Sequence, residues 1–145
     1  MTRVDFYVLP NADPAQRPLL ACKLADKAYG QGLKVYIHTA SESDSQQLDE
    51  LLWTFRDGSF LPHAIHSAVN GEPPPILLGH DHEPTGHPTS HTDVLINLGT
   101  DIPRFFGRFE RVAELVDQRT ELLTQSRERY RYYRERGYEL KSHNL

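Results

Sequence analysis

The pattern of hydrophobic and polar positions switches repeatedly between the repeat of a β-strand and that of an α-helix. Apolar residues alternate with others over residues 4–8, which predicts a first strand. Residues 20–28 then repeat at helical spacing up to the stop signals at Gly30 and Gly32. Because residues 34–39 predict a second strand, the chain is expected to begin with a strand, a helix and a strand.

The same alternation continues through the rest of the chain. A capping box formed by Ser43 and Gln46 predicts a second helix, which carries apolar residues on one side as far as Phe55. Further strands are predicted at residues 76–78, 94–98 and 111–116, a short helical turn at Pro103, and a last helix over residues 126–140. Alternation of this kind favours an α/β sandwich with a mostly parallel central sheet and helices on both faces.

Length and composition agree with a small intracellular protein. We expect residues 1–145 to form a single domain, because this is the usual size of one domain. The only cysteine, Cys22, excludes an intrachain disulfide and is expected to be a buried, inert thiol. No stretch approaches the ~20 apolar residues of a membrane span, and no signal peptide precedes the first strand. A cytoplasmic location without membrane contact is therefore expected.

Positive charge is concentrated near the end of the chain. Residues 126–140 contain five arginines and four tyrosines. Six Lys or Arg and three Asp or Glu lie in residues 126–141, whereas the whole chain has a formal net charge of −4. This segment is the part of the sequence most suited to contact a partner.

On a helix, four of these residues would share one face, namely Arg127, Tyr130, Arg131 and Arg134. Guanidinium groups beside an aromatic ring suit a peptide end that carries carboxylates, and they would also suit phosphate. The alternative is a solvated helix face on which Arg131 pairs with Glu128 or Glu135. Helical spacing alone leaves both interpretations open.

Motifs of nucleotide binding and catalysis are absent from the sequence. Residues 9–17, which follow the first predicted strand, lack the glycines of a dinucleotide-binding loop. Neither a Gly-Lys-Ser or Gly-Lys-Thr phosphate-binding sequence nor a Gly-x-Ser-x-Gly elbow occurs. The carboxylates form no recognisable acid/base pair, and no catalytic site is therefore expected.

Metal-ligand residue types gather in the loop at residues 80–91, although without a known ligand spacing. They are His80, Asp81, His82, Glu83, His87 and His91, with Asp93 just beyond. The loop-like composition of residues 79–92 predicts an exposed connection instead of a rigid ligand cage, so no metal is expected. A metal-dependent hydrolase built on this loop is the alternative. His63 and His66 are expected to be ordinary polar residues in a turn.

Several short motifs carry a resemblance over essentially the whole chain. They are residues 4–9 (VDFYVL), 48–53 (LDELLW), 59–63 (SFLPH), 93–98 (DVLINL), 127–134 (RERYRYYR) and 137–140 (GYEL). In this order and spacing they resemble the chi subunit family of bacterial DNA polymerase III holoenzyme. The resemblance implies a Rossmann-like three-layer sandwich without a nucleotide-binding loop. It also implies a noncatalytic accessory subunit in DNA replication, without a cofactor, acting at replication forks.

The resemblance implies a first partner for the basic helix. In the family this region captures the acidic C-terminal tail of single-stranded DNA-binding protein, which ends in Pro-Phe with a free carboxylate. Arg127 and Arg131 would face the carboxylates, Tyr130 would form an aromatic wall, and Val116 would line the pocket for the terminal Phe. Helix geometry alone adds Arg134 as a further cation on the same face. Contact with nucleic acid would be mainly indirect.

A second surface is predicted around residues 53–62. Trp53, Phe60, Leu61 and Pro62 could form an aromatic patch, or the large aromatics could complete the core. The resemblance implies that this region docks the psi subunit, which connects chi to the clamp loader. The alternative function is a direct single-stranded nucleic-acid binder that uses the same arginines and tyrosines, although the net negative charge argues against it.

Overall fold

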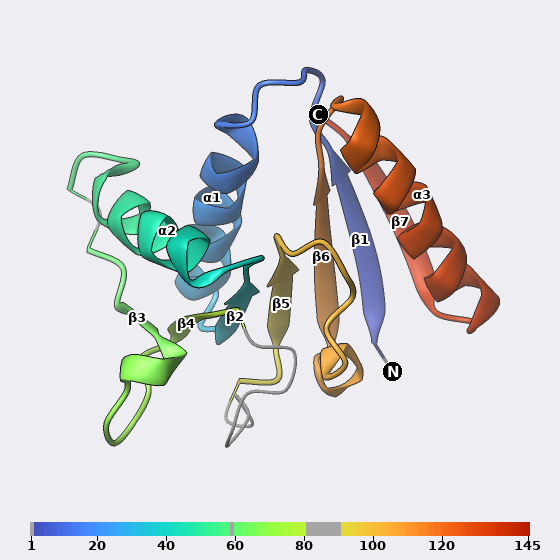
Figure 1. The fold of residues 1–145 in the computed structure, drawn as a ribbon. Coiled ribbons are helices and arrows are strands. Elements are labelled where there is room, and N and C mark those ends of the chain that lie inside the picture. Colours follow the sequence, from blue (N-terminus) through green and yellow to red (C-terminus); the bar gives the residue numbers. More distant parts are fainter. Residues whose placement is uncertain (1, 59, 81–90) are drawn as a thin grey trace.

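The fold was obtained as a computed structural model, which describes residues 2–58, 60–80 and 91–145 (Figure 1). The helices are α1 (Gln16–Gly30), α2 (Glu42–Thr54) and α3 (Thr120–Glu135), and single 3-10 turns lie at His66–Ala68 (η1) and Phe106–Arg108 (η2). The strands are β1 (Arg3–Val8), β2 (Val35–His38), β3 (His63–Ile65), β4 (Ile76–Gly79), β5 (Val94–Asn97), β6 (Arg111–Val116) and β7 (Glu139–Asn144).

The seven strands of the described chain form one open, parallel sheet in the order β3-β4-β2-β5-β6-β1-β7. Alternate side chains of a strand enter different cores: Ile37 belongs to the cluster with residues of α1 and α2, whereas Tyr36 belongs to the cluster that contains Tyr133 of α3. Helices α1 and α2 therefore cover one face and α3 the other, with α3 beside β1 and β7 in Figure 1. The predicted α/β sandwich is confirmed.

The inner strands are the elements that the hydrophobic pattern predicted best. Each of the five predicted strands corresponds to an observed one: β1, β2, β4, β5 and β6. Every residue of β2 and β4 is buried, which explains their nearly continuous apolar sequences. The short turn after Pro103 is also confirmed, because the amide of Phe106 donates to the Pro103 carbonyl. Cys22 is fully buried in α1, and burial raises the pKa of its thiol to about 12.

The predicted capping box of α2 was wrong. The N-cap is Ser41, whose hydroxyl accepts a hydrogen bond from the Asp44 amide at 3.1 Å. Helix α2 therefore begins at Glu42, before Ser43, and Asp44 instead of Gln46 occupies the third position. Two acidic residues in the first turn, Glu42 and Asp44, lie at the positive end of the helix dipole and favour this start.

The predicted extent of the last helix was also wrong. Helix α3 begins at Thr120 and ends at Glu135, and Gly137 then adopts a left-handed conformation with φ of 80°. The amide of Tyr138 bonds back to the Tyr133 carbonyl, which closes the end of the helix. The chain then forms β7, which pairs along its whole length with β1. Strand β7 escaped prediction because it is a mostly exposed edge strand with a polar sequence.

Candidate functional site

Four of the five residues predicted to bind an acidic tail lie on α3. We call them the α3 basic surface: Arg127, Tyr130, Arg131 and Arg134. The three arginines are exposed, and no carboxylate of the described residues lies within ion-pair distance of their guanidinium groups. The pairing that the solvated-face interpretation expected between Arg131 and the nearby glutamates is therefore not formed.

Tyr130 is held in place by the core. Its ring is half-buried and packs on Phe6 of β1, with the ring centroids 5.3 Å apart. A ring packed on the core thus lies among exposed, charged side chains, as a binding wall requires. Val116, at the end of β6, lies in the same core cluster and is only 2% exposed. Its side chain lies beneath this region and offers little surface of its own.

Sequence reasoning missed the buried polar network that fixes α3 on the sheet. Arg129 is buried, and its Nε donates to the Glu114 carboxylate of β6 at 3.0 Å. The hydroxyl of Tyr133 donates to the same carboxylate at 2.7 Å, and the Asn97 amide donates to it at 3.0 Å. One signal was present in the sequence, since Glu114 interrupts an apolar strand and a buried carboxylate needs a partner. Of the five arginines in residues 126–140, Arg129 is thus structural.

The second predicted surface is exposed at three of its four positions. Phe60 is 81% exposed and Trp53 is 53% exposed, and Pro62 is also exposed. Leu61 is only 3% exposed and belongs to the core under α1 and α2. We call Trp53, Phe60 and Pro62 the aromatic surface. The alternative in which both large aromatics complete the core is therefore wrong.

His63 supports the aromatic surface from below, and its assignment to a turn was wrong. It begins β3, its side chain is fully buried, and its ring centroid lies 4.5 Å from that of Trp53. Its two ring nitrogens lie 2.6 Å from the Leu61 carbonyl and 3.0 Å from the Asp49 carbonyl. These contacts fix the ring, so Trp53 rests on a rigid base. His66 does lie in a turn, at the start of η1.

The two surfaces lie at opposite sides of the molecule. The aromatic surface lies at the end of α2 and before β3, one edge of the sheet, whereas α3 packs beside β6 and β7, towards the other edge. Figure 1 shows this separation, with α2 and β3 far from α3. One partner could therefore occupy each surface without excluding the other.

The predicted metal-ligand residues fall largely outside the described chain. Asp81, His82, Glu83 and His87 are not among the described residues. The His91 ring is buried with Nε2 2.7 Å from the Pro74 carbonyl, and the Asp93 carboxylate accepts from the Lys34 amide at 2.8 Å. Across residues 2–58, 60–80 and 91–145, no group of three His, Cys, Asp or Glu side chains is placed to hold a metal ion.

Comparison with known proteins identifies the family. The family model described as DNA polymerase III chi subunit, HolC, matches residues 1–141. The chain belongs to the chi subunit family of DNA polymerase III. It is therefore an accessory subunit of the replicative DNA polymerase, as the motif resemblance implied.

Individual chi subunits match along nearly their whole length. The chi subunit of Pseudomonas aeruginosa is 46% identical over 145 residues, covering 100% of this chain and 98% of that protein. Those of Haemophilus influenzae and Escherichia coli are 31% and 29% identical, each covering 97% of this chain and 96% of the relative. Chi family membership therefore rests on the full chain and not on one motif.

A solved structure supports the fold alone. The crystal structure of T4 UvsW matches with a TM-score of 0.63 and 12% sequence identity, covering 99% of this chain and 42% of that chain. At this identity the match shows a shared α/β architecture and carries no inference about activity. Among the helices of the described residues, none is long and apolar enough to cross a membrane.

Proposed function

We propose that this chi family member is a noncatalytic adaptor. Its α3 basic surface binds the acidic C-terminal tail of single-stranded DNA-binding protein, and its aromatic surface docks the psi subunit, which leads to the clamp loader. The observation that carries the proposal is the set of three exposed guanidinium groups on one face of α3 that lack a carboxylate partner among the described residues. These groups are available to the carboxylates of a partner.

The chemistry of the α3 basic surface fits a peptide end. A guanidinium fork can donate two charge-assisted hydrogen bonds to one carboxylate, so Arg127 and Arg131 can each hold an acidic group of the tail. The half-buried ring of Tyr130 offers an apolar wall for a terminal aromatic side chain. Arg134, one turn further along the helix, adds positive charge. Capture of a C-terminal carboxylate is a recurring recognition mode.

The aromatic surface fits a stable protein contact. Two large exposed rings beside an exposed proline provide the apolar anchor that interface hot spots require. Because the two surfaces lie apart, the chain can bind psi and the tail together. A weak tail contact would then raise the effective concentration of the polymerase at DNA coated by its binding protein.

Direct binding of single-stranded DNA is less well supported. The three arginines of the α3 basic surface lie on a single helix of a chain with a net charge of −4, whereas nonspecific binding of single strands uses a basic groove that follows several nucleotides. Tyr132 and Tyr133, which might have stacked on bases, pack against the ring of Phe6 or Phe106. Little area of these two tyrosines thus remains for bases beside the exposed arginines.

Fluorescence anisotropy tests the proposal. A labelled acidic peptide ending in Asp-Ile-Pro-Phe is titrated with the wild-type chain and with Arg127→Ala and Arg131→Ala variants, beside labelled single-stranded DNA. We expect saturable peptide binding, weakened at least tenfold in each variant, because each loses a charge-assisted contact of about 1.5 to 3 kcal/mol. Arg108→Ala, which removes an exposed arginine outside α3, is the matched control and should bind normally.

Two other results would contradict the proposal. Equal weakening in Arg108→Ala would mean that general positive charge, and not the α3 basic surface, attracts the peptide. Tight binding to bare DNA without peptide binding would make direct nucleic-acid binding the primary function.

A further inference from the structure

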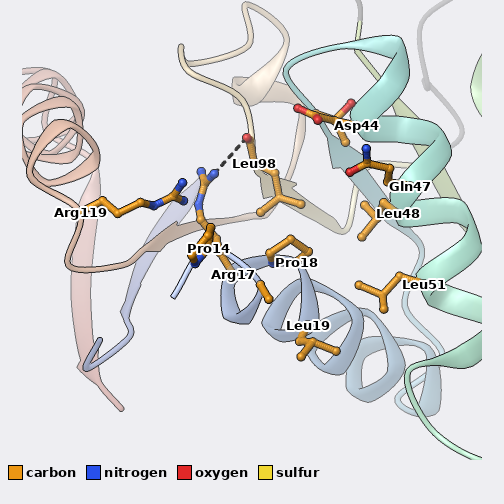
Figure 2. Close-up of a pocket in the computed structure, with 12 residues that line it drawn as sticks. Pro14, Arg17, Pro18, Leu19, Asp44, Gln47, Leu48, Leu51, Leu98 and Arg119 are labelled. Carbon is orange, nitrogen blue, oxygen red and sulfur yellow. Dashed lines mark hydrogen bonds between the residues drawn. The ribbon is translucent and has the colours of Figure 1, made fainter. Parts of the chain in front are cut away.

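A crevice of about 530 Å³ opens at the carboxyl ends of the central strands, and none of its lining residues belongs to either proposed partner surface. It lies between the starts of α1 and α2, and its wall includes Leu98 after β5 and Arg119 after β6. Figure 2 shows the residues that line it. In open parallel sheets, ligands bind outside the carboxyl ends of the strands, and this volume is in the range of small-molecule sites.

Arg17 places a buried positive charge in this crevice. The side chain, in the first turn of α1, is only 8% exposed. Its Nε donates to the Leu115 carbonyl at 2.8 Å and its Nη1 to the Leu98 carbonyl at 3.3 Å (Figure 2). The remaining nitrogen, Nη2, is buried and has no hydrogen-bond partner among the described residues. Among the described residues no carboxylate lies within ion-pair distance of Arg17, although the charges of Glu114 and Asp117 act on it from further away.

Two further features make the same end of the crevice positive. Arg119 lines it, and in Figure 2 its side chain extends towards the Arg17 guanidinium. Arg119 is held by Asp117, at 2.8 Å between Nη2 and Oδ2 and 3.0 Å between Nε and each carboxylate oxygen, which fixes its direction and offsets part of its charge. Helix α1 begins here with no acidic residue in its first turn, although the Asp13 carboxylate just before it accepts from the Ala15 amide at 3.0 Å, and the dipole end of the helix adds to the charge of Arg17. Burial lowers the pKa of Arg17 to about 10, which leaves the group charged at neutral pH.

The opposite wall of the crevice has a different character. Leu48 and Leu51 of α2 face Pro18 and Leu19 of α1 and form an apolar wall, and Asp44 and Gln47 add a hydrogen-bond acceptor and an amide. A ligand that fits both ends would carry an anionic head, an apolar body and a hydrogen-bond donor on that body. Two guanidinium groups and a helix N-terminus at the head position suit the several oxygens of a phosphate better than a single carboxylate.

We propose that this crevice binds a phosphate monoester of mononucleotide size, with the phosphate at Arg17 and Arg119 and the body against the leucines of α2. The absence of a glycine-rich loop agrees with this arrangement, because side-chain guanidinium groups, and not loop backbone, would hold the phosphate. This site is independent of the α3 basic surface and of the aromatic surface.

Chemical-shift mapping of the full ¹⁵N-labelled chain tests the proposal, with deoxyadenosine monophosphate as the probe. Deoxyadenosine lacks the phosphate, and inorganic phosphate lacks the nucleoside. Each of these two compounds therefore tests one half of the ligand. We expect saturable shifts at the amides of Gln16, Leu98 and Arg119, with weaker shifts from either of these two compounds. Arg119→Gln should weaken binding roughly tenfold, the loss of one charge-assisted contact. It is preferred to a change at Arg17, because Arg119 is 40% exposed whereas Arg17 is buried and bonded to two carbonyls. Since Asp117 loses its ion-pair partner in this variant, circular dichroism must first show an unchanged fold.

Two controls separate this site from the α3 basic surface. Arg108→Gln removes an exposed arginine elsewhere, and Arg131→Ala removes a cation of α3; both should bind the probe like the wild type. Equal binding of inorganic phosphate and the nucleotide would mean an adventitious ion only and would overturn the proposal. Chemical-shift changes confined to α3 would also overturn the proposal. The same holds if the crevice residues show no chemical-shift changes at millimolar concentrations of the nucleotide.

Discussion

The guanidinium of Arg129 in α3 lies 3.0 Å from the carboxylate of Glu114 in β6, and both side chains are buried. This ion pair joins the helix of the proposed tail-binding surface to the centre of the sheet. Tyr133 and Asn97 donate to the same carboxylate, so the charge of Glu114 is fully solvated by protein groups. The position of α3, and hence of its exposed arginines, depends on this network.

Removing Arg129 should destabilise the fold strongly. Arg129→Met leaves the Glu114 carboxylate buried without a cation, and breaking such a pair costs about 3 to 5 kcal/mol in the free energy of unfolding. Urea denaturation followed by circular dichroism measures this loss. Arg127→Met, an exposed arginine two residues away, is the matched control and should change stability by less than about 0.5 kcal/mol. Similar losses in both variants would show that the buried pair has no special role.

Gly137 should tolerate alanine poorly for reasons of backbone conformation alone. Its φ of 80° is unfavourable for a residue with a Cβ, although no atom lies within 4 Å of the added carbon. We expect Gly137→Ala to lower the free energy of unfolding by about 1 to 2 kcal/mol. Gly30→Ala at the end of α1 also meets no atom within 4 Å and has no positive φ, so it should be neutral or slightly stabilising. An equal loss in both variants would exclude the backbone explanation.

The strands that are buried within the sheet could be predicted from their hydrophobic pattern. Strand β6 was predicted with its observed bounds, and β2 and β4 differed only at their ends, because their apolar residues occupy the interior. Strand β7 has a mostly exposed, polar sequence, and β3 has only three residues, so neither left a readable pattern. Edge strands are defined by the neighbour that they pair with, which a single sequence does not show.

The residues of the α3 basic surface could be predicted from the sequence, whereas the role of Arg129 and the crevice could not. Helical spacing placed Arg127, Tyr130 and Arg131 on one face, and the structure brings them together there. The same spacing places Arg129 on another face but could not show that it is buried and paired, because its partner Glu114 lies on a strand. The crevice at Arg17 left no motif at all, since its wall comes from four separate segments of the chain.

The aromatic surface should be separable from the core beneath it. On the proposed function, Phe60→Ala removes an exposed anchor and should abolish co-purification with psi while leaving the thermal midpoint nearly unchanged. Leu61→Ala empties a core position and should lower the free energy of unfolding by about 2 to 5 kcal/mol. Tyr29→Ala, an exposed aromatic at the end of α1, is the control and should retain psi. Retention of psi by Phe60→Ala would remove this surface from the interface.

Acid should weaken the fold partly through Asp5. Burial alone would raise the pKa of this carboxyl, but hydrogen bonds with His143 and Arg111 and the charge of Arg3 outweigh it and hold the pKa below its usual 3.8. The unfolded chain therefore binds the proton more readily, and the stabilisation present at neutral pH is lost as the pH falls below about 5 and on through the lowered pKa of the folded state.

Comparing variants isolates the contribution of Asp5. The difference in free energy of unfolding between the wild type and Asp5→Asn should be larger at pH 7 than at pH 3. Asp57→Asn, which changes an exposed carboxylate, should give the same small difference at both values. A difference for Asp5→Asn that does not change with pH would show that its interactions do not favour the ionised form.

Salt should distinguish the two proposed partner contacts. The α3 basic surface relies on exposed charges, whose interactions weaken as the Debye length falls from about 14 Å at 0.05 M to about 4 Å at 0.5 M salt. We expect the Kd of the tail peptide to rise roughly tenfold over this range, and Arg131→Gln to flatten the dependence by removing one of the charges. Binding of psi by the apolar aromatic surface should change far less. A tail interaction that is insensitive to salt would contradict capture by charged contacts, whatever the effects of the individual substitutions.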